Sequence, residues 1–143
     1  MCDGMTNLDE IAAVAALAQS LVADLVERFE VGEPLPGARD WVLRENKWLA
    51  ARHGLDAELL VDEAGTRASV RDLAERTGDR LLPTAPRLGC AGELGAVREV
   101  VERGTSAGRQ RRWVAEGATL ADVVDRMVEE MDVSLAPRGA PRG

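Results

Sequence analysis

The segment from Arg39 to Gly54 sets two tryptophans among three arginines, in the order R-D-W-V-L-R-E-N-K-W-L-A-A-R-H-G. On a period of 3.6 residues, one arc of such a helix holds Trp41, Arg44, Glu45, Trp48 and Arg52. Apolar residues such as Val42 and Leu49 take much of the remaining circumference, which is typical of a buried helix. Arginines on a buried helix must find anions, either carboxylates of the protein or a ligand. This helix is therefore the first place to look for a binding site.

Two groups of cationic side chains could together receive an anion: Arg44, Lys47 and Arg52, and the run Arg109, Arg111 and Arg112. Guanidinium groups bind carboxylate or phosphate through paired hydrogen bonds, and the amides after Ser106 could present a helix N-terminus to the same anion. The alternative, which is the more common outcome for such spacings, is pairing on solvated faces with Glu45, Glu99, Glu102 and Glu116. Asn46 could likewise hold a substrate or bond to a neighbouring backbone.

The sequence lacks the residue patterns of several kinds of catalytic or binding site. His53 is the single histidine, and neither Cys2 nor Cys90 has the spacing of a metal ligand, so we expect no metal site within the chain. The nucleophile pattern G-x-S-x-G does not occur. The segment G-T-S-A-G-R-Q-R at residues 104–111 has too few residues between its glycines for a P-loop and lacks the lysine.

The composition indicates one globular domain built mainly from helices. The chain has 143 residues, of which 45% are hydrophobic but only 3% aromatic, so leucine, valine and alanine must fill the core. The net charge of −7 argues against nucleic acid or an anionic membrane as a partner. Cys2 and Cys90 are expected to be free thiols in a reducing compartment, and we expect a cytoplasmic protein without a signal peptide or membrane span.

Hydrophobic periodicity and capping residues predict the order of elements. A strongly apolar helix starts after Thr6 or Asn7 and runs from Ile11 toward Phe29. After the tryptophan-arginine helix, the residues at 58–61 and 66–70 could form a short β-hairpin, or the first of them could extend a helical turn. Later helices are expected from Ser69 to Pro83 with a break near Gly78, from Pro86 to Gly104, from Ser106 to Glu116 and from Leu120 to Met131. One domain of residues 1–131 is followed by a disordered tail of residues 132–143.

Four segments resemble, in order, the C-terminal part of the carboxylate-amine ligases of the glutamate-cysteine ligase type 2 family. They are D-G-M-T-N-L-D-E-I-A-A-V-A-A-L-A-Q-S-L-V near the start, R-E-N-K-W-L-A-A-R-H-G-L-D-A from residue 44, A-P-R-L-G-C-A-G-E-L from residue 85 and G-T-S-A-G-R-Q-R-R from residue 104. The resemblance spans about residues 3–131, and four segments in order are more specific than any one of them.

The resemblance implies a fold and an activity. The fold would be mainly α, the helical C-terminal portion of an α+β glutamine-synthetase-like ligase, with room for one short β-hairpin. The activity would be an ATP- and magnesium-dependent ligation, in which a glutamate-type carboxylate is phosphorylated and then attacked by an amine such as that of cysteine. No catalytic residue is assigned, and the positions that the resemblance implies lie near an amino-acid substrate or a nucleotide are Arg44, Asn46, Lys47, Arg52, Arg109, Gln110 and Arg111.

One departure from the family pattern concerns the part that would precede this region. The family carries its metal-binding glutamates and most of its antiparallel sheet there, and this chain begins where the family's chain leaves an inner strand. We therefore expect a C-terminal fragment, a split subunit or the remnant of a truncated gene, inactive until the missing N-terminal half is supplied. Exposed apolar surface would favour binding to that half or a homo-oligomer. The alternatives are a noncatalytic helical interaction or oligomerisation protein derived from the family, and a nonfunctional product that expresses weakly or is molten.

Overall fold

The computed structural model describes residues 5–135, and within them the fold is mainly α with one short β-hairpin, which confirms the predicted fold class. The elements are, in order, α1 (Leu8–Glu30), α2 (Asp40–His53), the 3-10 turn η1 (Gly54–Asp56), β1 (Glu58–Leu60), β2 (Arg67–Ser69), α3 (Val70–Leu81), η2 (Ala85–Leu88), α4 (Ala91–Gly95), α5 (Val97–Arg103), α6 (Ser106–Ala115) and α7 (Leu120–Leu135). None of the helices in this part of the chain is long and apolar enough to span a bilayer.

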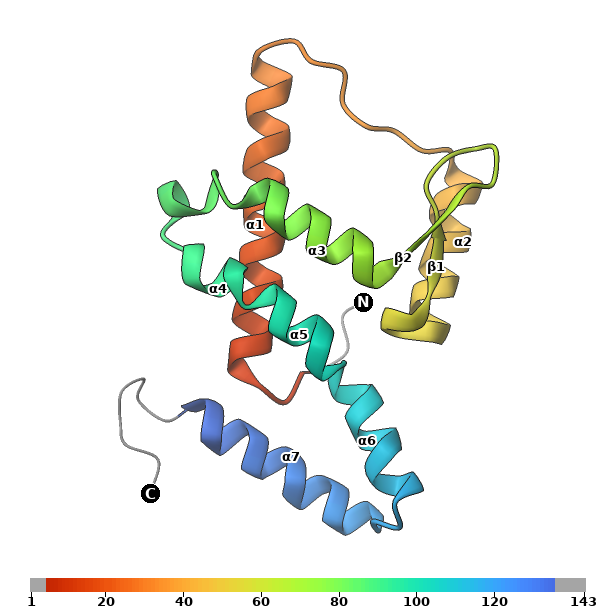
Figure 1. Ribbon diagram of the computed structural model, residues 1–143, viewed down its shortest axis with the longest axis vertical. Coiled ribbons are helices and arrows are strands. Elements are labelled where there is room, and N and C mark those ends of the chain that lie inside the picture. Colours follow the sequence, from red (N-terminus) through yellow and green to blue (C-terminus); the bar gives the residue numbers. More distant parts are fainter. Residues whose placement is uncertain (1–4, 136–143) are drawn as a thin grey trace.

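Helix α1 is the axis of the core, and α3, α4 and α5 cross it (Figure 1). Of the two expected N-caps, Asn7 is the one used, because its Oδ1 accepts hydrogen bonds from the amides of Asp9 and Glu10 at 2.9 and 3.2 Å. The side of α1 that meets the other helices is lined with small residues. Ala13 and Ala16 of α1 pack there with Leu81 of α3, Ala85 of η2, Leu94 of α4 and Val97 of α5 in one buried cluster.

Helix α2 and the hairpin form a second unit, joined to α1 by the exposed segment 31–39 (Figure 1). Strands β1 and β2 pair antiparallel with Leu60 opposite Arg67, so the hairpin alternative is confirmed. Asn46 holds α2 to this hairpin, because its amide donates to Leu60 O and accepts from Leu60 N, both at 2.8 Å. The structural alternative for Asn46 is thus the one observed.

The expectation that α2 is buried is wrong for the described structure. Only Val42 and Leu49 of this helix are buried, whereas Trp41 and Trp48 are 47% and 56% exposed. The main contacts of α2 are with β1 and η1, which cover one side of it. Hydrophobic periodicity shows which faces of a helix are apolar, but not which of these faces is covered by the rest of the protein.

Two helix boundaries also differ from the prediction. The single helix expected from Pro86 to Gly104 is divided into η2, α4 and α5, because Gly89 takes a left-handed conformation with φ of 69° and ends the first turn. Gly78 does not break α3, since this buried residue lies against Val97 of α5, and contact with α5 offsets the conformational cost of a helical glycine.

The last helix continues to Leu135, beyond its expected end at Met131. Its final turn is tied to the start of α1, because Ser134 Oγ accepts a hydrogen bond from the amide of Leu8 at 3.1 Å. The first four residues of the expected tail are therefore helical. The rest of that tail, residues 136–143, lies outside the described part of the chain.

Candidate functional site

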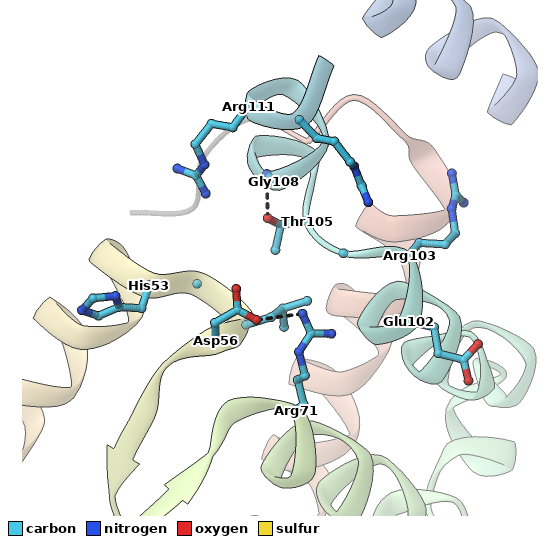
Figure 2. Close-up of a pocket in the computed structure, with 12 residues that line it drawn as sticks. His53, Asp56, Arg71, Glu102, Arg103, Thr105, Gly108 and Arg111 are labelled. Carbon is cyan, nitrogen blue, oxygen red and sulfur yellow. Dashed lines mark hydrogen bonds and ion pairs between the residues drawn. The ribbon is translucent and has the colours of Figure 1, made fainter. Parts of the chain in front are cut away.

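A cavity of about 280 Å³ lies where the end of α2 and the turn η1 face the start of α6 (Figure 2). Helix α3 contributes Arg71, and the end of α5 contributes Glu102 and Arg103. The complete lining is His53, Gly54, Leu55, Asp56, Arg71, Glu102, Arg103, Gly104, Thr105, Gly108, Arg111 and Arg112. Residues 53–56 and 104–112 belong to two of the motif segments described above, so segments far apart in the sequence share one wall.

Two glycines and a helix cap shape this wall. Gly54 and Gly104 have φ values of 57° and 83°, which L-residues rarely adopt, and they end α2 and α5 at the cavity. Thr105 caps α6, because its Oγ1 accepts a hydrogen bond from the amide of Gly108 at 3.1 Å (Figure 2). The N-terminus of α6 therefore faces the cavity, and the partial positive charge at a helix N-terminus attracts anions.

The cavity is positively charged although the chain as a whole is acidic. Its lining has four arginines against two carboxylates. The guanidinium of Arg71 has partners within the protein, because it forms a salt bridge with Asp56 at 2.9 Å and donates a hydrogen bond to Val101 O at 2.6 Å. The other three, Arg103, Arg111 and Arg112, form no salt bridge with any residue in the range 5–135. They remain able to bind carboxylate or phosphate oxygens.

Comparison with known proteins assigns the chain to a family. The family model described as glutamate-cysteine ligase family 2 matches residues 1–130. The chain belongs to the glutamate-cysteine ligase family 2. It is 47% identical over 130 residues to "Putative glutamate--cysteine ligase 2-2" of Rhodococcus jostii (strain RHA1), a match that covers 90% of this chain and 35% of the relative.

Two further relatives show the same pattern of coverage. "Putative glutamate--cysteine ligase 2" of Clavibacter sepedonicus is 47% identical over 134 residues, which cover 93% of this chain and 35% of the relative. The protein of the same name from Thermobifida fusca (strain YX) is 39% identical over 143 residues, which cover 100% of this chain and 36% of the relative. The chain thus spans about a third of the length of the curated relatives it matches.

The structure separates the seven residues that the family resemblance placed near substrate or nucleotide. Arg111 lines the cavity. Asn46 is bound to the hairpin, as described above, and Gln110 donates to Ser106 Oγ at 3.0 Å. Three cationic residues of α2 are exposed and form no salt bridge with a described residue: Arg44, Lys47 and Arg52. The seventh residue, Arg109, is buried.

Arg109 joins three helices inside the protein. Its Nε and Nη2 donate to the two carboxylate oxygens of Glu130 on α7, at 2.7 and 2.9 Å. Its Nη1 lies 2.7 Å from Glu10 Oε1 on α1, and this buried oxygen has no other polar partner among the described residues. The same Nη1 donates to Gly104 O at 2.7 Å. Because Gly104 lines the cavity, Arg109 positions the cavity wall while its own charge is neutralised by protein carboxylates.

Arg71, Arg103 and Thr105 line the cavity but were not among the sequence-based candidates. The G-T pair before α6 carries a local signal, since a glycine that ends one helix directly precedes the threonine cap of the next. Arg71 and Arg103 carry no such signal, because only the packing of α3 against α5 brings them to this wall.

Glu130 makes the buried cluster sensitive to acid. Burial pushes the pKa of its carboxyl upward, but hydrogen bonds from Arg109 and Thr6 and the positive charges of Arg109 and Arg103 outweigh burial, so this pKa lies below its ordinary value. A carboxyl with a lowered pKa stabilises the fold above its unfolded pKa of about 4.3, and this stabilisation is lost as the pH falls through the folded value.

We therefore expect the free energy of unfolding to fall below about pH 5, and the substitution Glu130→Gln to remove part of that dependence. Urea unfolding at pH 7, 5, 4 and 3 measures both proteins. Equal losses of stability in the two proteins between pH 5 and 3 would show that Glu130 has no part in acid sensitivity.

Within residues 5–135, no three histidine, cysteine, aspartate or glutamate side chains come together as a group that could hold a metal ion. This part of the chain does not by itself fit magnesium, and no step below depends on one.

Proposed function

We propose that this chain is the anion-binding helical part of an ATP-dependent carboxylate-amine ligase of the glutamate-cysteine type, and that turnover requires the remainder of the ligase fold. Membership of the ligase family supports the reaction class. One structural observation carries the proposal further: two segments of the family pattern meet at a positively charged cavity beside the N-terminus of α6. The missing remainder could be carried on the same polypeptide or on a separate one.

Both steps of the proposed reaction need positive charge beside the transferred phosphoryl group. A carboxylate oxygen of the amino acid attacks the γ-phosphorus of ATP and ADP leaves; the amine then attacks the acyl carbon and inorganic phosphate leaves, with the amine proton passing to solvent or a base. Negative charge is present on the transferred phosphoryl group in both steps. We assign Arg103, Arg111 and Arg112, with the start of α6, to hold these oxygens. The magnesium ions that such ligases use are assigned to ligands outside residues 5–135.

A noncatalytic helical interaction protein is the second candidate. The observation that favours it is the amount of exposed apolar surface on α1 and α7, where Phe29 and Leu120 are 70% and 79% exposed. Such surface suits binding to another protein whether or not chemistry follows.

The test is amino-acid-dependent release of ADP. The 143-residue chain is assayed alone and after co-expression with the part of the Rhodococcus jostii relative that lies outside the match, with glutamate and cysteine as substrates. We expect no turnover by the chain alone and measurable turnover by the complex. Turnover by the chain alone would contradict the requirement for the remainder, and a stable complex without turnover would favour the noncatalytic candidate.

A further inference from the structure

Helix α1 carries apolar side chains on both its inward and its outward side. On the side that faces α3, α4 and α5, the small residues Ala13, Ala16 and Ser20 are almost completely buried, and Leu17 and Leu21 pack against the same core. The outward side carries five large apolar residues that are exposed: Ile11, Val14, Val22, Val26 and Phe29 are 37%, 38%, 61%, 49% and 70% exposed. Large apolar residues normally face inward.

The outward residues form one continuous face. On a helical wheel, the arc that holds Ile11, Val14, Val22, Val26 and Phe29 also holds Ala15, Ala18 and the partly buried Leu25, and no charged residue between positions 11 and 29. At 1.5 Å per residue this face is about 27 Å long. In Figure 1 the last turns of α1 extend past α3, and α7 lies near its other end. We call these eight residues the outward face of α1.

A continuous exposed apolar face of this length is typical of a surface that binds another apolar surface, so we expect the outward face of α1 to be covered in the working protein. The curated relatives are about three times as long as this chain, which leaves two-thirds of their length to be placed. We infer that the outward face of α1 is the surface onto which the remainder of the ligase fold docks. This inference rests on the proposed function, because it takes that remainder as the partner.

Electrostatics argues against two other occupants of the outward face of α1, a second copy of this chain and a strongly charged partner. A second copy would bring together two chains of net charge −7, and the outward face itself supplies no ion pairs to offset that repulsion. A strongly charged partner would lose hydration against a face that offers it no counter-charge. The remainder of the ligase fold meets neither objection. If it packs on the outward face of α1 in the complete fold, it carries a matching apolar surface, which is exposed whenever the two parts are apart.

The experiment compares two valine-to-aspartate substitutions at helix positions of similar exposure. Val22→Asp places a charge in the outward face of α1, at a residue that is 61% exposed. Val133→Asp places the same charge on α7, at a residue that is 65% exposed and lies on the polar side of that helix. Each variant is co-expressed with the unmatched part of the Rhodococcus jostii relative, and the dissociation constant of the purified complex is measured beside a thermal melt of the chain alone.

We expect Val22→Asp to weaken the complex by at least about tenfold and Val133→Asp to change the dissociation constant by less than about twofold, with unchanged melting of both chains. No complex with the unsubstituted chain, or equal binding by both variants, would overturn the inference. A dimer of the chain alone in sedimentation velocity, made monomeric by Val22→Asp, would also overturn it and assign the face to a second copy. Binding that depends on Val22 without ligase turnover would leave the docking surface intact and refute only the proposed function.

Discussion

Replacing Arg109 with methionine is expected to destabilise the chain by about 3–5 kcal/mol, which is the typical effect of removing one partner from a buried ion pair. Arg109 is 6% exposed, and its guanidinium is the cation that faces both Glu10 and Glu130. Without it, two carboxylates remain in a low-dielectric interior. Urea unfolding at pH 7 measures the loss.

The control is Arg98→Met, because Arg98 and its partner Asp79 are more than half exposed. An exposed pair of this kind contributes at most about 1 kcal/mol. Adding Glu10→Gln and Glu130→Gln to Arg109→Met is expected to recover part of the stability, since no unpaired charge then remains buried. If Arg109→Met were as stable as the Arg98 variant, the buried cluster would not be what holds α1, α6 and α7 together.

Replacing Arg111 with alanine is expected to raise the KM of the reconstituted ligase for its anionic substrate by about 10- to 100-fold, with little change in stability. A hydrogen bond to a charged group contributes about 1.5–3 kcal/mol, which corresponds to this range. Arg111 lines the cavity, is exposed and forms no salt bridge with a described residue, so its removal leaves no buried charge unpaired. Steady-state kinetics with glutamate and ATP varied in turn identify the affected substrate.

Arg111→Lys should retain part of the affinity, because an ammonium group keeps the charge but not the paired geometry of a guanidinium. Arg98→Ala serves as the matched surface control, because Arg98 is exposed on α5 and does not line the cavity. A KM that is unchanged in Arg111→Ala would remove this residue from the substrate site.

Arg109 and Arg111 show how far the sequence predicts the site. Both were expected near substrate, and they are only two residues apart, which places them about 200° apart on α6. The sequence predicts that they point in different directions. It does not predict which of them faces Glu10 and Glu130, because those carboxylates come from α1 and α7 and meet α6 only through tertiary packing. The same packing brings Arg71 and Arg103 to the cavity.

The local elements were predictable for a different reason. Asn7, Ser69 and Thr105 each cap a helix through a hydrogen bond to an amide two or three residues later, and such signals are contained in a few adjacent residues. The exposure of Trp41 and Trp48 on α2 could not be predicted in this way. Whether an apolar arc is covered depends on neighbours, and within the described residues only one side of α2 has them.

The proposed function requires the cavity between η1 and α6 to bind the anionic groups of a ligase substrate. Its most direct test is a titration of the 15N-labelled chain, in complex with the unlabelled remainder of the relative, with glutamate and separately with ATP. We expect saturable shifts concentrated at the amides of Gly54 and residues 104–108. Saturation that shifts only residues 44–48 on the exposed side of α2, or turnover without any shift at the cavity, would contradict it.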